Sequence, residues 1–506
     1  MKNLFQWLAA ASVCSFFGCA MNGNRRVSSH SISRDSHVNS TALDSVSMTR
    51  YELQRANQVF EPVVIAASGL IEAEGSKTSN VVFAAVELPD STQTSDDSVK
   101  SSGGTTLDEL VNLAIANNPA VKELAATTQK AAGFRTQVGL YANPIVGYQG
   151  QQLADRGTDQ HTVFAQQEFA TANKLELNRR VQNEALRAQL QELEAQKLRV
   201  ATDIHTLFYQ ALGYQKQLKL IKDFRGLMDK SFELAQLRLK AAEGSKIDVL
   251  QTKVQRSEID LIYRQTQARY DAAWREISAV AGVQDRTPTK LAGEFPESSD
   301  AMSWDSIATT IVGSSPEYAA AQARIGQARA ELQRHGVQAI PNLTVQFGAG
   351  VDNGTQSGMM NLQVGAPIPV FNKNQGNIVA ARAEYCRTVM ESQRIENAIR
   401  ARLATVSRDF ESALEAVTVY SKDILPSAQE ALALSETAYK AGEMNFIQLL
   451  VARQTYFESN LQYVNSQAQM ASAKAKVDGF VLSGSLDAVM DRSGSDSLRG
   501  LTFSQQ

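Results

Sequence analysis

The apolar positions between residues 174 and 240 follow a helical period. From Leu186 onward they recur three, four or seven residues apart, which is the spacing of a coiled-coil seam. They are Leu190, Leu193, Val200, Ile204, Leu207, Ala211, Tyr214, Leu218, Ile221, Phe224, Met228, Phe232, Ala235 and Leu239. At about 1.5 Å per residue, such a helix is about 100 Å long. The pattern therefore predicts part of a rod or tube rather than a globular helix.

A second helical stretch of the same kind is predicted at residues 375–440. Pro426 interrupts it, and we expect a kink there because proline removes one backbone donor and clashes with the preceding turn. Shorter helices are expected around the two long ones, at residues 107–140, 245–281, 316–338 and 445–480.

Two stretches between the helices show a period of two instead. Leu343, Val345, Phe347, Ala349 and Val351 alternate with polar residues and glycines, and after a turn at residues 352–355 the alternation resumes with Met360, Leu362, Val364, Ala366 and Ile368. A weaker version occupies residues 145–150 and 161–169. The pattern is typical of a membrane barrel with a wet lumen, although a sandwich in water produces the same alternation.

The chain repeats itself at a spacing of about 200 residues. Residues 238–250 align with residues 438–450, and eight of the 26 positions from 238 to 263 are identical in this register. Upstream, Asn118-Pro119 corresponds to Ser315-Pro316, and Lys174 corresponds to Lys373. We infer a duplication in which both halves share one plan.

The beginning of the chain predicts export. Lys2 precedes an apolar run too short to span a bilayer, so residues 1–18 are interpreted as a signal peptide. Residues 15–19 resemble a bacterial lipoprotein processing site, which would make Cys19 the acylated first residue. Residues 19–106 are predicted to be a low-complexity tether, 107–300 the first repeat, 301–484 the second repeat, and 485–506 a flexible tail.

Composition narrows the function without naming it. Fifty Lys and Arg residues against 53 Asp and Glu residues leave a net charge of only -3, which argues against a nucleic-acid partner. Once the signal is removed no plausible intrachain disulfide remains, and Cys386, within a helical pattern, is expected to be buried.

No enzymatic motif stands out. The five histidines lack metal-ligand spacing, and the glycines of residues 348–354 have the wrong spacing for a nucleotide loop and precede a strand instead of a helix. Small residues that face the lumen of a barrel explain these glycines better. We therefore expect neither catalysis, nor a metal site, nor a cofactor.

Four strands cannot close a membrane barrel, because the smallest have about eight, so several chains must share one. The order helix, hairpin, long helix, turn, helix, present twice in an exported chain, resembles the TolC-like outer-membrane efflux family over residues 107–484. The resemblance implies a mainly α chain with a β-barrel contribution: a homotrimer with a twelve-stranded barrel that continues into a helical tunnel in the periplasm. It also implies a passive duct that works with a periplasmic adaptor and an inner-membrane pump, of the resistance-nodulation-division type.

The motif at residues 366–377 is similar to the heavy-metal efflux (CzcC-like) branch, which makes metal cations one candidate cargo. Its residues are Pro367, Pro369, Phe371, Asn372 and Gly376, at the exit from barrel to helix. The prolines are expected to stiffen the strand exit, and residues 372–374 to cap the new helix. Residues 168–173 of the first half lack both prolines.

The turns at residues 241–245 and 441–445 resemble the family's Tyr-x-x-Gly tip, which faces the adaptor. Tyr439 and Gly442 keep this pattern, whereas Leu239 and Ala242 do not. The predicted tip or gate residues are Ala242, Glu243, Gly244, Asp248, Gly442, Glu443 and Met444. Symmetry would multiply Glu243, Asp248 and Glu443 into acidic rings that favour cations; the alternative is that they are ordinary solvated charges.

Two other functions remain open at this point. A periplasmic coiled-coil lipoprotein scaffold uses the same helices but needs no apolar-outward strands, and a duct for type I protein secretion uses the same architecture with another cargo.

Overall fold

The computed structural model of the protein describes residues 104–154, 157–283, 287–296 and 302–498. The predicted signal peptide, Cys19 and nearly all of the predicted tether lie outside these residues. Within the described residues, no helix is both long and apolar enough to cross a membrane.

The long helices lie where the periodicity predicts them. α5 is a single helix of 67 residues, Lys174–Lys240, and it turns into α6, Lys246–Val280. In the second half the corresponding helix is interrupted: α9, Gln375–Val419, passes through a π-helical segment, η1, Tyr420–Ile424, into α10, Leu425–Lys440. α11, Phe446–Asp478, follows. Pro426 lies in the first turn of α10, so the regular α-helix is interrupted next to the proline, and the wider π-turn ahead of it accommodates the proline ring.

The helix predicted at residues 107–140 is in fact two helices, α3, Leu107–Asn117, and α4, Pro119–Gln137. Asn118 is the cause, because the residue before a proline disfavours the helical conformation and here has ψ of 126°. Its Oδ1 then accepts the N–H of Ala120 at 2.9 Å and so starts α4. The second half repeats the arrangement with α7, Trp304–Ser314, which the sequence pattern did not predict, and α8, Pro316–Gly336.

The four strands form one antiparallel sheet in the order β1-β2-β3-β4. Their bounds are Ile145–Gln151 for β1, Gln160–Phe169 for β2, Leu343–Asp352 for β3 and Ser357–Gly365 for β4. β2 of the first half pairs with β3 of the second, so the sheet joins the two repeats. Among the described residues, β1 and β4 each keep one unpaired edge.

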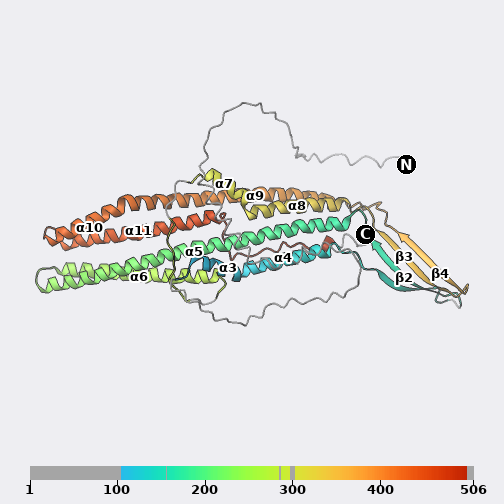
Figure 1. Ribbon diagram of the computed structural model, residues 1–506, viewed down its shortest axis with the longest axis horizontal. Helices are drawn as coiled ribbons and strands as arrows, with labels where there is room; N and C mark the ends of the chain where they lie inside the picture. Colours follow the sequence, from blue (N-terminus) through green and yellow to red (C-terminus); the bar gives the residue numbers. More distant parts are fainter. Residues whose placement is uncertain (1–103, 155–156, 284–286, 297–301, 499–506) are drawn as a thin grey trace, which may run out of the picture. The chain divides into compact units, whose positions relative to one another are not determined.

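The helices form a wall that continues from the sheet (Figure 1). α5 packs against α4 and α6 of its own half and against α8 and α11 of the other half. α9 packs against α8 and α11, and α10 against α11. The order along the wall is therefore α4 and α6, then α5, then α8 and α11, then α9 and α10. One free edge of the chain consists of α4 and β1, and the other of β4 and α9.

Residues 485–498 correct the prediction of a flexible tail, because they pack along α5. The N–H of Ser485 donates to Asp203 Oδ2 at 2.8 Å, and Leu498 is only 4% exposed. Leu498 completes a small apolar cluster with Val138, Val181 and Ala330. The polar composition of this stretch suggested disorder, but polar side chains of α5 supply the partners that its backbone needs.

Cys386 also differs from its prediction, because it is exposed on α9. α9 lies at an edge of the wall, in contact with α8 and α11 on one side only among the described helices of the wall.

Candidate functional site: an open wall with two hairpin tips

One face of the sheet is apolar across all four strands. Val146 lies opposite Ala165, Ala165 opposite Phe347, and Phe347 opposite Leu362, so the four side chains form a row on one face. Val146 and Leu362 are 72% and 71% exposed. The predicted alternation is confirmed, and the apolar side chains at both edges of the sheet are exposed.

The opposite face is polar. It carries Gln149, Gln151, Gln166, Gln346 and Gln363. In its centre Phe164 lies between Gly147 and Gly348, and a Cβ on Gly147 would be 2.5 Å from Phe164 Cζ. These glycines leave room for the Phe164 ring and for close packing of the neighbouring strands. For Gly348, this agrees with its interpretation as a small residue and not as part of a nucleotide loop.

The first junction between sheet and wall, from β2 to α5, is held by buried polar contacts. Lys174 is 2% exposed, and its Nζ donates to Ile340 O at 2.5 Å and to Asn342 Oδ1 at 2.7 Å. Thr171 Oγ1 donates to Pro341 O at 2.5 Å. The start of α5 is thereby fixed to the segment that leads from α8 into β3.

Two buried cations lie close together at this junction. Burial and the charge of Arg334 lower the pKa of Lys174 to about 8, against the opposing effect of Glu168. Arg334 is fully buried, which lowers its pKa to about 10, and its guanidinium donates to Asn178 Oδ1 at 2.6 Å and to Gln338 Oε1 at 2.8 Å. Lys174 is recognisable in the sequence as a repeat position, but the network is not, because its partners come from α5, α8 and the segment after α8.

The second junction is built differently. Asn173 and Asn374 are the equivalent positions, since both precede a long helix with left-handed φ values of 57° and 60°. Lys174 and Lys373 were therefore paired wrongly from the sequence: the helices begin at Lys174 and Gln375, and Lys373 is exposed ahead of its helix. The two repeats differ by a residue or two in the length of their turns, so the spacing between equivalent positions changes along the chain.

The predicted cap by residues 372–374 is also wrong. Asn374 occupies the position before the helix, but its side chain accepts no helical N–H. Instead its Nδ2 donates to His335 O at 2.9 Å, and its own N–H donates to Asn372 Oδ1 at 2.9 Å. These bonds tie the start of α9 to the end of α8.

The motif residues before Asn374 lie on the surface. β4 ends at Gly365, and Pro367, Phe371, Asn372 and Gly376 are exposed, while Pro369 is half-exposed. The exit from the sheet is thus a stiff and largely uncovered connection.

The two helix-to-helix turns share one backbone geometry. The N–H of Glu243 donates to Arg238 O at 2.9 Å, and the N–H of Glu443 donates to Ala438 O at 2.9 Å. A bond that spans five residues at a helix end, with a left-handed residue inside it, is a Schellman turn. The left-handed residue is Ala242, with φ of 56°, in the first turn and Gly442, with φ of 79°, in the second.

Each turn is followed by a capping box, formed by Ser245 with Asp248 and by Asn445 with Gln448. Asp248 Oδ2 accepts the N–H of Ser245 at 3.0 Å, so its carboxylate has a structural role in starting α6. The other predicted tip residues are exposed or half-exposed: Ala242, Glu243, Gly244, Gly442, Glu443 and Met444.

Side chains connect the two hairpins near their tips. Arg238 Nη1 donates to the Tyr439 hydroxyl at 2.8 Å. Farther from the tips, the rings of Phe224 and Phe457 stack with their centroids 4.1 Å apart. The motif comparison identified Tyr439, but its partner follows from packing and has no local sequence signal.

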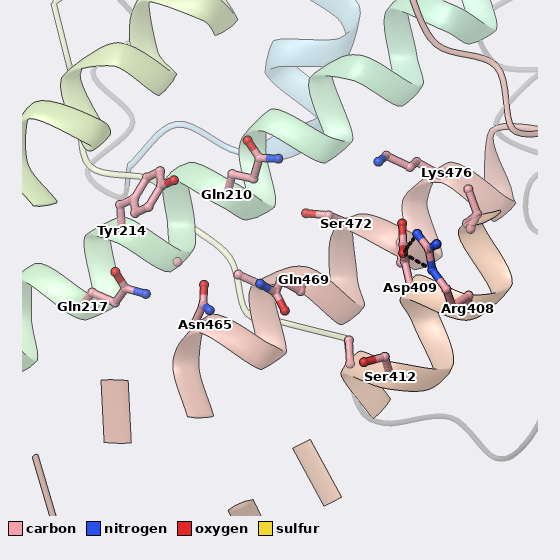
Figure 2. A pocket seen from close by; sticks show the side chains of 15 residues that line it. Gln210, Tyr214, Gln217, Arg408, Asp409, Ser412, Asn465, Gln469, Ser472 and Lys476 are labelled. Carbon is pink, nitrogen blue, oxygen red and sulfur yellow. Dashed lines mark hydrogen bonds and ion pairs between the residues drawn. The ribbon is translucent and has the colours of Figure 1, made fainter. Parts of the chain in front are cut away.

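A cleft of about 570 Å³ opens between α5, α9 and α11 (Figure 2). Its lining includes four neutral amides, Gln210 and Gln217 on α5 and Asn465 and Gln469 on α11, together with Lys476. Asp409 is paired with Arg408 at 2.7 Å. The lining offers hydrogen bonds in both directions and little net charge, which suits contact with water. In the part of the chain that the structure describes, no cluster of His, Cys, Asp or Glu side chains is arranged to hold a metal ion.

Comparison with known proteins identifies the architecture. The profile of the family described as outer membrane efflux protein matches residues 310–479. The chain is therefore similar to the TolC-like outer membrane efflux family. The fold is similar to that of the solved channel CusC, with a TM-score of 0.64 at 14% identity, over 75% of this chain and 92% of that one.

Two relatives of the chain have known functions. The chain is 21% identical to the cobalt-zinc-cadmium resistance protein CzcC of Cupriavidus metallidurans over 54% of its length and 65%, or less than two thirds, of the relative. It is 23% identical to the pyoverdine export outer membrane protein OpmQ of Pseudomonas putida over 74% of its length and 86% of that protein. The resemblance to efflux proteins, including a metal-resistance protein, is confirmed.

Proposed function

We propose that the protein is the outer-membrane duct of a tripartite efflux system. Three copies close one twelve-stranded barrel and one helical tunnel, through which a pump in the inner membrane drives small solutes by way of a periplasmic adaptor. Cys19, acylated, anchors each copy to the outer membrane. The duct itself catalyses nothing and holds no cofactor.

The open wall is the observation that carries this proposal. β1 and β4 have unpaired edges, and an open sheet cannot persist in lipid because its backbone groups find no water there. α4 and α9 stand at the free edges of the helical wall in the same order. Further copies, joined edge to edge, satisfy both layers at once.

The two faces of the sheet indicate which side of the closed barrel faces the lipid and which faces the lumen. The row from Val146 to Leu362 is apolar and exposed, as a lipid-facing surface requires. The glutamine-rich face then lines the lumen. A coiled-coil scaffold in the periplasm gains nothing from an apolar outer face of this kind.

The hairpin tips are the proposed contact with the adaptor and the proposed gate. They lie at the far end of the long helices from the sheet (Figure 1). Their Schellman turns give a rigid end to each hairpin, and Glu243 and Glu443 project into solvent there. In a closed ring of copies, these two carboxylates form acidic rings that favour cations.

The cargo is proposed from the relatives. One acts in cobalt, zinc and cadmium resistance and the other in pyoverdine export, so small solutes are the common class. Metal cations are the first cargo to test, because the motif at residues 366–377 resembles the heavy-metal branch. Protein secretion has no specific support in the geometry.

Conductance in planar lipid bilayers tests the duct. Purified full-length protein that forms trimers is expected to insert and to give stable, stepwise ionic currents. Well-folded oligomers that neither insert nor conduct would favour the scaffold instead.

The acidic tips are tested by charge removal. The double variant Glu243→Gln and Glu443→Gln is expected to lower the preference for cations over anions in a salt gradient. The matched control is Glu176→Gln, which removes an exposed carboxylate near the other end of α5. Equal reversal potentials for both variants and the parent protein would show that the tip carboxylates are ordinary surface charges.

A further inference from the structure

An exposed apolar patch follows the end of β4. Ile368 is 83% exposed, Val370 63% and Phe371 92%. Large apolar side chains that lie together and face solvent usually mark a surface that another molecule covers. We name Ile368, Val370 and Phe371 the exit patch.

The exit patch is held in place before any partner arrives. Pro367 and Pro369 restrict the backbone on its strand side. On its helix side, the N–H of Lys373 donates to Gln375 Oε1 at 2.9 Å, and Asn374 is bonded to His335 O. A preorganised apolar surface loses little conformational entropy on binding.

A second apolar patch lies at the other free edge of the chain. Leu140 and Tyr141, between α4 and β1, are 44% and 69% exposed, and Ile145 at the start of β1 is 57% exposed. We name Leu140, Tyr141 and Ile145 the entry patch.

The topology brings these two patches together between copies. In an antiparallel order β1-β2-β3-β4, the first residue of β1 and the last residue of β4 lie at the same end of the sheet. When β4 of one copy pairs antiparallel with β1 of the next, the residues after Gly365 come to lie beside the residues before Ile145. The exit patch of one copy then meets the entry patch of its neighbour.

We propose that the exit patch and the entry patch form an apolar clasp between neighbouring copies, at the level where the sheet gives way to the helices. This inference rests on the shared barrel of the proposed function and adds its specific contact. A second copy of the chain is the favoured partner of the exit patch. The same neighbouring copy that pairs with the free edge of β4 also covers this patch. The clasp joins neighbouring copies at the junction between sheet and helices, a level at which the copies are held neither by strand pairing nor by coiled-coil packing.

Cysteine cross-linking tests the contact. In a Cys386→Ser background, the pair Tyr141→Cys and Phe371→Cys is expected to give disulfide-linked dimers and trimers on oxidation, because residues whose Cα atoms approach within about 7 Å can be bridged. Each single variant controls for pairing with other thiols. The pair Tyr141→Cys and Leu434→Cys controls for random collision, because Leu434 is 64% exposed on α10, near the tips. Trimers that conduct but do not cross-link at 141 and 371 overturn the clasp and leave the duct intact.

Two further variants test whether a neighbouring copy or membrane lipid covers the exit patch. Phe371→Ser is expected to weaken trimer association about tenfold or more per interface, as loss of a buried aromatic side chain does. The fold of each chain is expected to persist, because Phe371 is 92% exposed within it. The fluorescence of Phe371→Trp in vesicles is expected to resist quenching by brominated lipid chains. Strong quenching, with an unchanged trimer in Phe371→Ser, assigns the patch to the membrane and rejects the clasp.

Discussion

The two junctions between sheet and wall come from one duplicated plan, yet one is closed and the other open. At the first junction, Lys174 and Arg334 are buried and bonded to backbone and amide oxygens. At the second, Phe371 and Lys373 face solvent. The difference follows from position: β2 and α5 lie inside the sheet and the wall, whereas β4 and α9 are at their edge. Duplicated segments therefore diverge according to what covers them.

The long helices differ in the same sense. α5 has neighbours on both sides and remains unbroken over its whole length. α9 and α10 form the edge, and they contain the π-helical segment and Pro426. The C-terminal segment adds to the contrast, because residues 485–498 lie along α5. The segment forms an ion pair with α4 through Asp491 and Lys130 and one with α9 through Arg492 and Glu391.

Removal of the C-terminal segment is expected to have the largest effect on this contrast. Truncation after Gly484 deletes Leu498 from its apolar cluster and leaves Asp203 without its backbone donor at Ser485. We expect a loss of several kcal/mol of unfolding free energy. Thermal unfolding of the detergent-solubilised protein by circular dichroism measures it. Truncation after Leu498 is the control, and equal melting of both truncated chains would contradict the role of this segment.

Replacing the buried lysine is expected to have the next largest effect. Lys174→Met removes the charged donor to Ile340 O and Asn342 Oδ1 at the start of α5. A cost of about 1–3 kcal/mol follows. Lys373→Met, at the exposed lysine of the other junction, is expected to cost less than about 0.5 kcal/mol. Similar losses in chemical denaturation would show that the two junctions are equivalent after all.

The same lysine predicts a pH dependence of stability. Its pKa falls from the ordinary 10.5 to about 8 in the folded chain. Between these values the unfolded chain holds a proton that the folded chain has lost, so the contribution of Lys174 to stability increases as pH rises from about 8 to 10.5. Melting temperatures of the parent protein minus those of Lys174→Met are expected to rise across this window. A flat difference would mean that Lys174 titrates normally.

The tips offer the smallest and most closely matched comparison. Gly442→Ala places a Cβ on a left-handed residue and is expected to destabilise the second turn by about 1 kcal/mol. Ala242→Gly relieves the same strain in the first turn and is expected to be neutral or slightly stabilising. Hydrogen exchange of the amides of Glu243 and Glu443 reports each turn separately. A destabilising Ala242→Gly or a stabilising Gly442→Ala would contradict this account of the two turns.

Features that repeat along the chain were predictable, and features that depend on a distant partner were not. The period of the apolar residues located α5 and the strands closely, and the repeat located both tips. The break at Asn118 was missed although the residue before a proline is a known signal. The cap at Asn374 was predicted wrongly because the Asn374 side chain bonds to His335. The sequence around Asn374 contains no signal that His335 lies close to it.

By itself the sequence determined the periodic elements and the twofold plan, because helices and strands follow from the spacing of apolar residues within a few turns of chain. The tertiary structure alone decided which equivalent residue is buried. Lys174 and Lys373 are the same residue type near equivalent helix starts, but only the former meets the segment at residues 340–342. Burial depends on which neighbour an element has, and β4 and α9 lie at edges of the sheet and the wall, whereas β2 and α5 lie inside them.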